Sequence, residues 1–190
     1  MPAQGSSGFL MDNLKAIVES LLFVADTPLT IDKIRSILKL KDRKAIENAL
    51  TTLTEEYETQ KRGFFLSKVS GGYQFRTRPE FAEWIRQMKR HKPVRLSRPA
   101  METLAIVAYK QPVLRSDIEH LRGVDCGGTL RTLLERGLIR VLGRRDLPGR
   151  PMVYGTTKRF LEVFELKDLT DLPTLKELQD MQQSWPNDST

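Results

Sequence analysis

The side chains best suited to chemistry in this sequence are three arginines in a short segment that contains proline and glycine. Arg144, Arg145 and Arg150 lie within GRRDLPGRP, residues 143–151. Guanidinium groups stay charged and form paired hydrogen bonds with phosphate oxygens. Because proline and glycine favour tight connections between strands, the segment predicts a hairpin tip that offers these arginines as a phosphate contact. In the alternative interpretation, Arg150 and Asp146 hold the tip to its own domain.

Nucleophilic and metal-ligating side chains are scarce. The single cysteine, Cys126, precedes Gly127 at a predicted helix start, where a thiolate is favoured. The two histidines, His91 and His120, lie far apart, so the four ligands of a structural zinc site are lacking. The sequence has no phosphate-binding loop motif and no GxGxxG after a strand. We interpret Cys126 as a small filler side chain at a helix entry and expect no enzyme, cofactor or metal; an enzyme that uses Cys126 is a third hypothesis.

Composition indicates the class of protein that carries these residues. The chain has 190 residues, of which 39% are hydrophobic, and a formal net charge of +7. The length allows one or two domains. No apolar run approaches the roughly 20 residues of a membrane helix, and no secretory signal is expected. A lone cysteine cannot form an intramolecular disulfide and fits a reducing compartment. We therefore predict a cytoplasmic protein that does not contact a membrane.

The arginine tip is flanked by strand and helix signals. Residues 138–142 and 152–156 are predicted to be two strands of one hairpin. Caps and breakers predict the helices around it: one that begins at Ser97, one through Ile118 that ends at Gly123, one over residues 127–136, and a closing helix capped by Thr157. Three helices, a hairpin and a closing helix follow one another in the order of a winged helix.

The first half of the chain has the same order of elements. Apolar spacing predicts three helices, the second capped by Thr30 and the third beginning near Asp42. Two strands, residues 64–69 and 73–77, flank a turn with two glycines. Pro79 then opens a closing helix, whose apolar residues are Phe81, Trp84, Ile85 and Met88.

Residue matches support two copies of one fold. Residues 19–25, ESLLFVA, align with residues 102–108, ETLAIVA, and Pro28 and Ile34 align with Pro112 and Ile118. The predicted fold class is α+β, mainly helical, with two tandem winged-helix domains. The predicted divisions are a disordered N-terminus (1–10), a first domain (11–89), a basic linker (90–96), a second domain (97–165) and a leucine-containing tail (166–190).

The third helix of each domain is poorly suited to reading DNA bases. The first domain's third helix ends in EEYE, residues 55–58, whose carboxylates would repel phosphates. In the second domain, Arg131 and Arg136 are accompanied by Glu135. Sequence-specific readers present a denser set of Arg, Lys, Asn and Gln. We therefore favour a protein-binding module, with a tandem winged-helix transcriptional regulator as the alternative.

These segments resemble the ScpB family of bacterial segregation and condensation proteins. The resemblance is dense from Leu96 to Pro173: it rests on residues 102–112, ETLAIVAYKQP, residues 133–139, LLERGLI, the tip around Gly143, and residues 154–157, YGTT. It extends more loosely to the start of the chain, where residues 19–25, ESLLFVA, and residues 71–73, GGY, also fit. One departure is residues 114–116, LRS, where the family tends to have a threonine cap.

The resemblance implies an adaptor subunit without catalytic activity. A member of this family is a homodimer that binds the kleisin ScpA and reaches SMC indirectly, in chromosome condensation and segregation at the nucleoid. Direct contact with DNA would be weak or indirect. We predict self-association through Leu14, Ile17 and Leu21 of the first domain. The predicted contacts with ScpA are Tyr109 of the second domain and Leu166, Leu169 and Leu172 of the tail.

Overall fold

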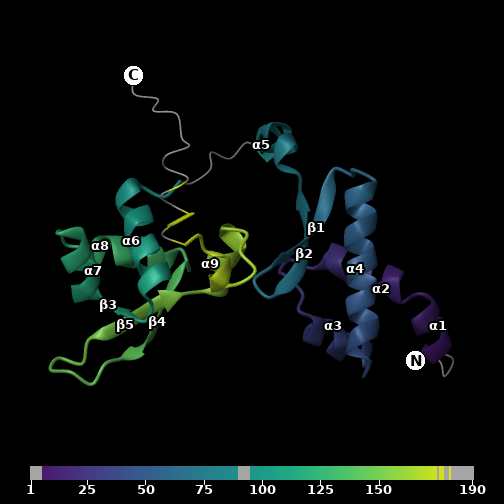
Figure 1. The fold of residues 1–190 in the computed structure, drawn as a ribbon, viewed down its shortest axis with the longest axis horizontal. Coiled ribbons are helices and arrows are strands. Elements are labelled where there is room, and N and C mark those ends of the chain that lie inside the picture. The colour runs from purple at the N-terminus through teal and green to yellow at the C-terminus, as the bar shows by residue number, and fades with distance from the viewer. Residues whose placement is uncertain (1–5, 90–94, 175, 178–179, 181–190) are drawn as a thin grey trace.

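The computed structural model describes residues 6–89, 95–174, 176–177 and 180, and it contains two winged-helix domains (Figure 1). The first domain comprises α1 (Ser6–Asp12), α2 (Leu14–Val24), α3 (Ile31–Leu38), α4 (Arg43–Thr59), β1 (Phe64–Val69), β2 (Gly72–Thr77), a 3-10 turn (Pro79–Phe81) and α5 (Ala82–Lys89). The second comprises α6 (Arg98–Lys110), β3 (Val113–Leu114), α7 (Arg115–Arg122), α8 (Gly127–Glu135), β4 (Ile139–Arg144), β5 (Met152–Thr156), α9 (Lys158–Val163) and a 3-10 turn (Leu169–Asp171). The predicted fold class is confirmed.

Side-chain caps begin the helices where the sequence predicts them. The Thr30 hydroxyl accepts a hydrogen bond from the Lys33 N–H at 3.2 Å, and an Asp42 carboxylate oxygen accepts from the Lys44 N–H at 2.9 Å. Ser97 and Thr157 cap α6 and α9 in the same way. Such caps satisfy backbone donors that a helix start leaves unpaired. At α7, which lacks a threonine cap, an Asp117 oxygen accepts from the Leu114 N–H instead.

Each domain has its own hydrophobic core. The fully buried side chains of the first core come mainly from the first three helices after α1: Val18, Leu22, Ile34, Ile46, Leu50 and Leu53. The second core contains Leu104, Val107, Ile118, Cys126, Leu133, Ile139 and Phe160. Ile34 and Ile118, which the repeat aligns, are both completely buried. The structure therefore repeats the plan that the sequence repeats.

The two hairpins differ in their sheets. β1 and β2 pair through a two-residue turn in which Ser70 and Gly71 both have positive φ, at 52° and 70°. In the second domain β5 is central, between β3 and β4. β3 is a two-residue strand that the sequence did not predict, and a register shift interrupts β4 between Val141 and Gly143.

Two predicted segments differ in the structure. The N-terminus, expected to be disordered through residue 10, is helical from Ser6 in α1, while residues 1–5 lie outside the described chain. The closing helix α5 does not pack on the first core. Trp84 and Met88 on its apolar side are 65% and 75% exposed, and Figure 1 shows α5 apart from α3 and α4. Of the predicted linker, residues 90–94 also lie outside the described residues.

The first hairpin contacts α9 and the chain that follows it. The backbone N–H groups of Ser70 and Gly71 donate to the carbonyl oxygens of Leu166 and Lys167, each at 2.9 Å. Arg76 on β2 donates from Nη2 to the Glu162 carbonyl oxygen at 2.9 Å. We call this set of contacts the interdomain clasp. It fixes the first hairpin against the second domain (Figure 1).

Candidate interaction surfaces

The second hairpin, β4–β5, carries the predicted phosphate-contact residues on an exposed tip. Arg144, Arg145 and Arg150 are all exposed. Arg144 Nη1 donates to the Arg150 carbonyl oxygen at 3.0 Å, and the Arg145 N–H donates to the Pro151 carbonyl oxygen at 2.9 Å. These bonds hold the backbone of the tip. Among the described residues no ion pair joins Arg150 or Asp146 to the rest of the domain, and the tip is held by one side-chain bond from Arg144 and one backbone bond from Arg145.

The helices that would enter a DNA groove expose few groups that read bases. On α8, Arg131 is ion-paired with Glu135, with 2.9 Å between Nε and Oε1. On α4, Glu56 pairs with Lys15, and Glu55 and Glu58 are exposed. Carboxylates at this end of α4 oppose phosphate binding. The geometry therefore does not favour a sequence-specific regulator.

An apolar groove runs along the outer side of α1 and α2. Its lining is mostly apolar: Phe9, Asn13, Ala16, Ile17, Ser20, Leu21 and Val24. Phe9 and Val24 are 66% and 77% exposed, and the neighbouring Phe23 is 77% exposed. Two of the residues predicted for self-association, Ile17 and Leu21, thus lie together in this groove. Leu14 does not, because it is buried in the first core.

Comparison of the two repeats shows that the groove side of α2 is unusual. The aligned segments match Ile17, Leu21 and Val24 with Ala100, Leu104 and Val107. In α6 these three residues are buried in the second core. Their counterparts in α2 line the groove: Val24 is 77% exposed, and Ile17 and Leu21 are only partly buried, although Leu21 also packs against the first core. α2 instead buries Leu14, Val18 and Leu22. α2 is therefore apolar on two sides, of which one is fully covered within its own domain and the other only in part.

The structure places the predicted ScpA-contact residues around the end of the second domain. Leu166 and Leu172 are partly buried and pack against the second core. The Tyr109 hydroxyl donates to the Pro173 carbonyl oxygen at 2.7 Å, which ties the tail to α6. Leu169 is exposed and lines a pocket with Leu142 and other residues of the second hairpin and α9. Leu169 and the exposed part of Tyr109 remain available to a partner.

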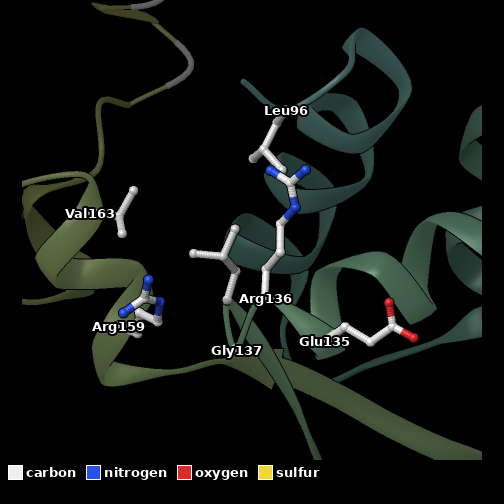
Figure 2. Close-up of a pocket in the computed structure, with 7 residues that line it drawn as sticks. Leu96, Glu135, Arg136, Gly137, Arg159 and Val163 are labelled. Carbon is white, nitrogen blue, oxygen red and sulfur yellow. The ribbon is translucent and has the colours of Figure 1, made fainter. Parts of the chain in front are cut away.

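A further pocket lies where α8 ends and β4 begins (Figure 2). Its lining combines apolar and charged side chains: Leu96, Glu135, Arg136, Gly137, Leu138, Arg159 and Val163. Arg159 and Val163 come from α9, while Figure 2 shows Arg136 extending towards Leu96 and the Glu135 carboxylate directed away from the pocket. The pocket therefore combines two arginine side chains with apolar walls.

Cys126 is completely buried in the second core. Burial is the largest cause that raises the pKa of its thiol, and the nearby Glu119 carboxylate adds to the effect. A raised pKa opposes formation of the reactive thiolate. Within the described chain no cluster of His, Cys, Asp and Glu has the arrangement of a metal site. In the same residues no helix is long and apolar enough to span a membrane.

The sequence analysis missed several residues that line these surfaces. Phe9 and Val24 complete the groove. The difference in burial between α2 and α6 identifies Val24 only once the structure is known, and Phe9 lies outside the aligned segments. The exposed stripe formed by Phe81 of the 3-10 turn and by Trp84 and Met88 of α5 was predicted as an apolar helix side but not as an exposed surface. Arg76 of the clasp gave no local signal, because its partners lie 86 and 89 residues away.

Comparisons with known proteins agree on one family. The family model described as "Segregation and condensation complex subunit ScpB" matches residues 16–175. Segregation and condensation protein B of Syntrophotalea carbinolica is 49% identical over 168 residues, which are 88% of this chain and 85% of that protein. The Moorella thermoacetica protein of the same name is 47% identical over 93% of this chain and 90% of its own length. A crystal structure titled as a dimer of the ScpB N-terminal domain complexed with ScpA peptide is 25% identical over 41% of this chain and 96% of that chain, with a TM-score of 0.38.

Proposed function

This chain belongs to the ScpB family of segregation and condensation complex subunits, and from that membership we propose that it is a non-enzymatic adaptor. In this proposal it forms a homodimer, binds the kleisin ScpA and is linked to SMC through ScpA. It acts in chromosome condensation and segregation in the cytoplasm, at the nucleoid. Its surfaces suit such a role, because they offer apolar docking faces and its one nucleophilic thiol is buried.

The observation that carries the proposal is the incompletely covered groove side of α2. Ile17, Leu21 and Val24 correspond to core residues of the second repeat, yet they line an open groove. Burial of apolar surface contributes roughly 25 cal/mol per Å², so covering this groove with a second copy stabilises a dimer. α1, which brings Phe9 to the groove, extends the apolar surface.

The dimer is tested by a charge placed in the groove. We expect Val24→Asp to convert the purified protein from dimer to monomer, measured by light scattering after size-exclusion chromatography at micromolar concentration. Val124→Asp is the matched control, because Val124 is 54% exposed in the second domain and outside the groove. A wild-type monomer, or a Val24→Asp variant that remains a dimer, would remove self-association through α2 from the proposal.

For ScpA, we propose a contact centred on Leu169 and Tyr109 of the second domain. Leu169 presents an apolar side chain beside Leu142 and Leu161 in a surface pocket. Tyr109 holds the tail in place through Pro173 while 40% of its own surface stays exposed. Leu166 and Leu172 support this surface by packing on the second core, so they position the tail without facing the partner.

Co-expression with ScpA followed by mass measurement of the purified complex tests this contact. We expect Leu169→Asp to abolish co-purification and Leu121→Asp, an exposed leucine on α7, to preserve it. A third variant, Trp84→Asp on α5, tests whether ScpA binds the first domain instead. Normal binding by Leu169→Asp together with loss in Trp84→Asp would move the ScpA contact to the exposed stripe of the first domain.

A further inference from the structure

The two hairpins of this chain are exposed to different degrees and carry different charges. The turn of the first hairpin, Ser70 and Gly71, is neutral and its N–H groups donate within the interdomain clasp. The second hairpin projects away from both domains, as Figure 1 shows, and residues 141–150 are exposed throughout. The hairpin of the first domain is thus bound to another part of the chain, whereas the hairpin of the second domain is exposed to solvent.

The free hairpin is strongly basic. Residues 139–156, from the start of β4 to the end of β5, contain four basic side chains, and Asp146 is their only acidic one. Arg140 and Lys158 line one pocket at the base of this hairpin, and Arg144, Arg145 and Arg150 form its tip. On α7 and α8, by contrast, exposed arginines are ion-paired: Arg115 with Glu119 and Asp125, and Arg131 with Glu135. The positive charge of the hairpin is therefore concentrated on one projecting element.

We propose that the β4–β5 hairpin binds the phosphate backbone of duplex DNA without sequence preference. A narrow projecting tip with several guanidinium groups matches a groove edge lined by phosphates, where arginine is a common contact. The proposal does not include base reading, because α8 exposes few polar side chains and its Arg131 is ion-paired with Glu135. The inference goes beyond the adaptor role and does not depend on ScpA binding.

The proposal predicts how strongly the affinity for DNA depends on salt concentration. If each tip arginine neutralises one phosphate, log K falls against log salt concentration with a slope of about −2.7 from these three residues. That slope corresponds to roughly 40-fold weaker binding when salt rises from about 50 to about 200 mM. Two labelled duplexes of unrelated sequence should bind with equal affinity, since phosphates carry no sequence information.

Fluorescence anisotropy with the full-length protein and a fluorescein-labelled duplex tests the proposal. We expect the triple variant Arg144→Gln, Arg145→Gln, Arg150→Gln to lose at least about tenfold in affinity and most of the salt slope. The matched control Lys33→Gln, Lys41→Gln, Lys44→Gln removes the same charge from exposed positions of the first domain and should bind as wild type. A third variant, with the three tip arginines changed to lysine, keeps the charge and should retain binding, which separates charge from hairpin structure.

Three results would overturn the proposal. One is wild-type protein that binds neither duplex at about 50 mM salt, and another is equal affinity of the glutamine variant and the wild type. The third is binding of poly-glutamate in the absence of DNA binding, which would assign the tip to an acidic protein surface. Retained binding by the lysine variant and loss in the glutamine variant would support it.

Discussion

Tyr57 on α4 donates its hydroxyl to Glu19 on α2, with 2.5 Å between Tyr57 Oη and Glu19 Oε1. The bond joins the two helices at the edge of the first core, where the Tyr57 ring packs against Phe64 and Phe75 with centroids 5.2 and 4.9 Å apart. Burial, followed by the hydrogen bond to Glu19, raises the pKa of Tyr57 above its ordinary value of 10.0. The neutral phenol is therefore the form that the folded protein prefers.

This preference predicts alkaline destabilisation. A pKa raised by folding stabilises the native state fully below pH 10, and the contribution is lost as the pH rises through the raised pKa. We expect Tyr57→Phe to cost about 1 kcal/mol at neutral pH, because a hydrogen bond is lost, and to reduce the alkaline loss. Urea unfolding followed by circular dichroism from neutral pH to above pH 10 measures both. Equal alkaline slopes in the two proteins would contradict the assignment.

Gly72 should be sensitive to a single added methyl group. A Cβ at this position would lie 2.9 Å from the backbone C and O atoms of Leu29, which cannot move aside as a side chain can. We expect Gly72→Ala to destabilise the protein by about 1–3 kcal/mol, as overpacking does. Gly63→Ala is the control, since nothing lies within 4 Å of its Cβ position and its φ is not positive. Similar thermal melts for both variants would refute this close approach.

The interdomain clasp should depend more on Arg76 than on its acidic partner. Arg76 Nη1 pairs with Glu165 at 3.1 Å, and Nη2 also donates to the Glu162 carbonyl oxygen. Glu165 is mostly exposed, so Glu165→Ala should cost at most about 1 kcal/mol of unfolding free energy. Arg76→Ala also removes the bond to the backbone, and we expect a cost of about 1–2 kcal/mol. Denaturant titration ranks the two variants, and the reverse order would argue against the clasp.

Cys126 should resist alkylation until the second domain unfolds. The thiol is completely buried and its pKa is raised, so both access and thiolate formation are suppressed. Iodoacetamide at about pH 8 should modify it slowly in native protein and completely in urea, as mass spectrometry would show. Rapid modification of the native protein would mean that α8 opens readily, and it would favour the hypothesis of a reactive Cys126 thiol.

Signals within a few residues of one another predicted most of the fold. Thr30, Asp42, Ser97 and Thr157 each cap the helix that the sequence assigned to them, since a cap acts on N–H groups two or three residues away. Gly123 likewise ends α7 with a φ of 69°. β3 escaped prediction because a two-residue strand has no periodicity, and its pairing with β5 is nonlocal.

The surfaces were harder to predict than the elements. Apolar periodicity identified α2 and α5 but could not say which apolar side is covered, because coverage depends on neighbours far away in sequence. Leu14 and Ile17, three residues apart, illustrate this: one is in the core and the other in the groove. The exposure of the tip arginines was easier to predict, since a charged side chain on a hairpin tip has no core in which to be buried.

The segment after α9 has a consequence for how the chain unfolds. Leu166 and Leu172 pack on the second core, while the carbonyl oxygens of Leu166 and Lys167 accept from the first hairpin. Neither repeat can open fully at this edge without breaking bonds that stabilise the other. The two domains are therefore thermodynamically coupled, and heating should yield one cooperative transition where two independent repeats would yield two.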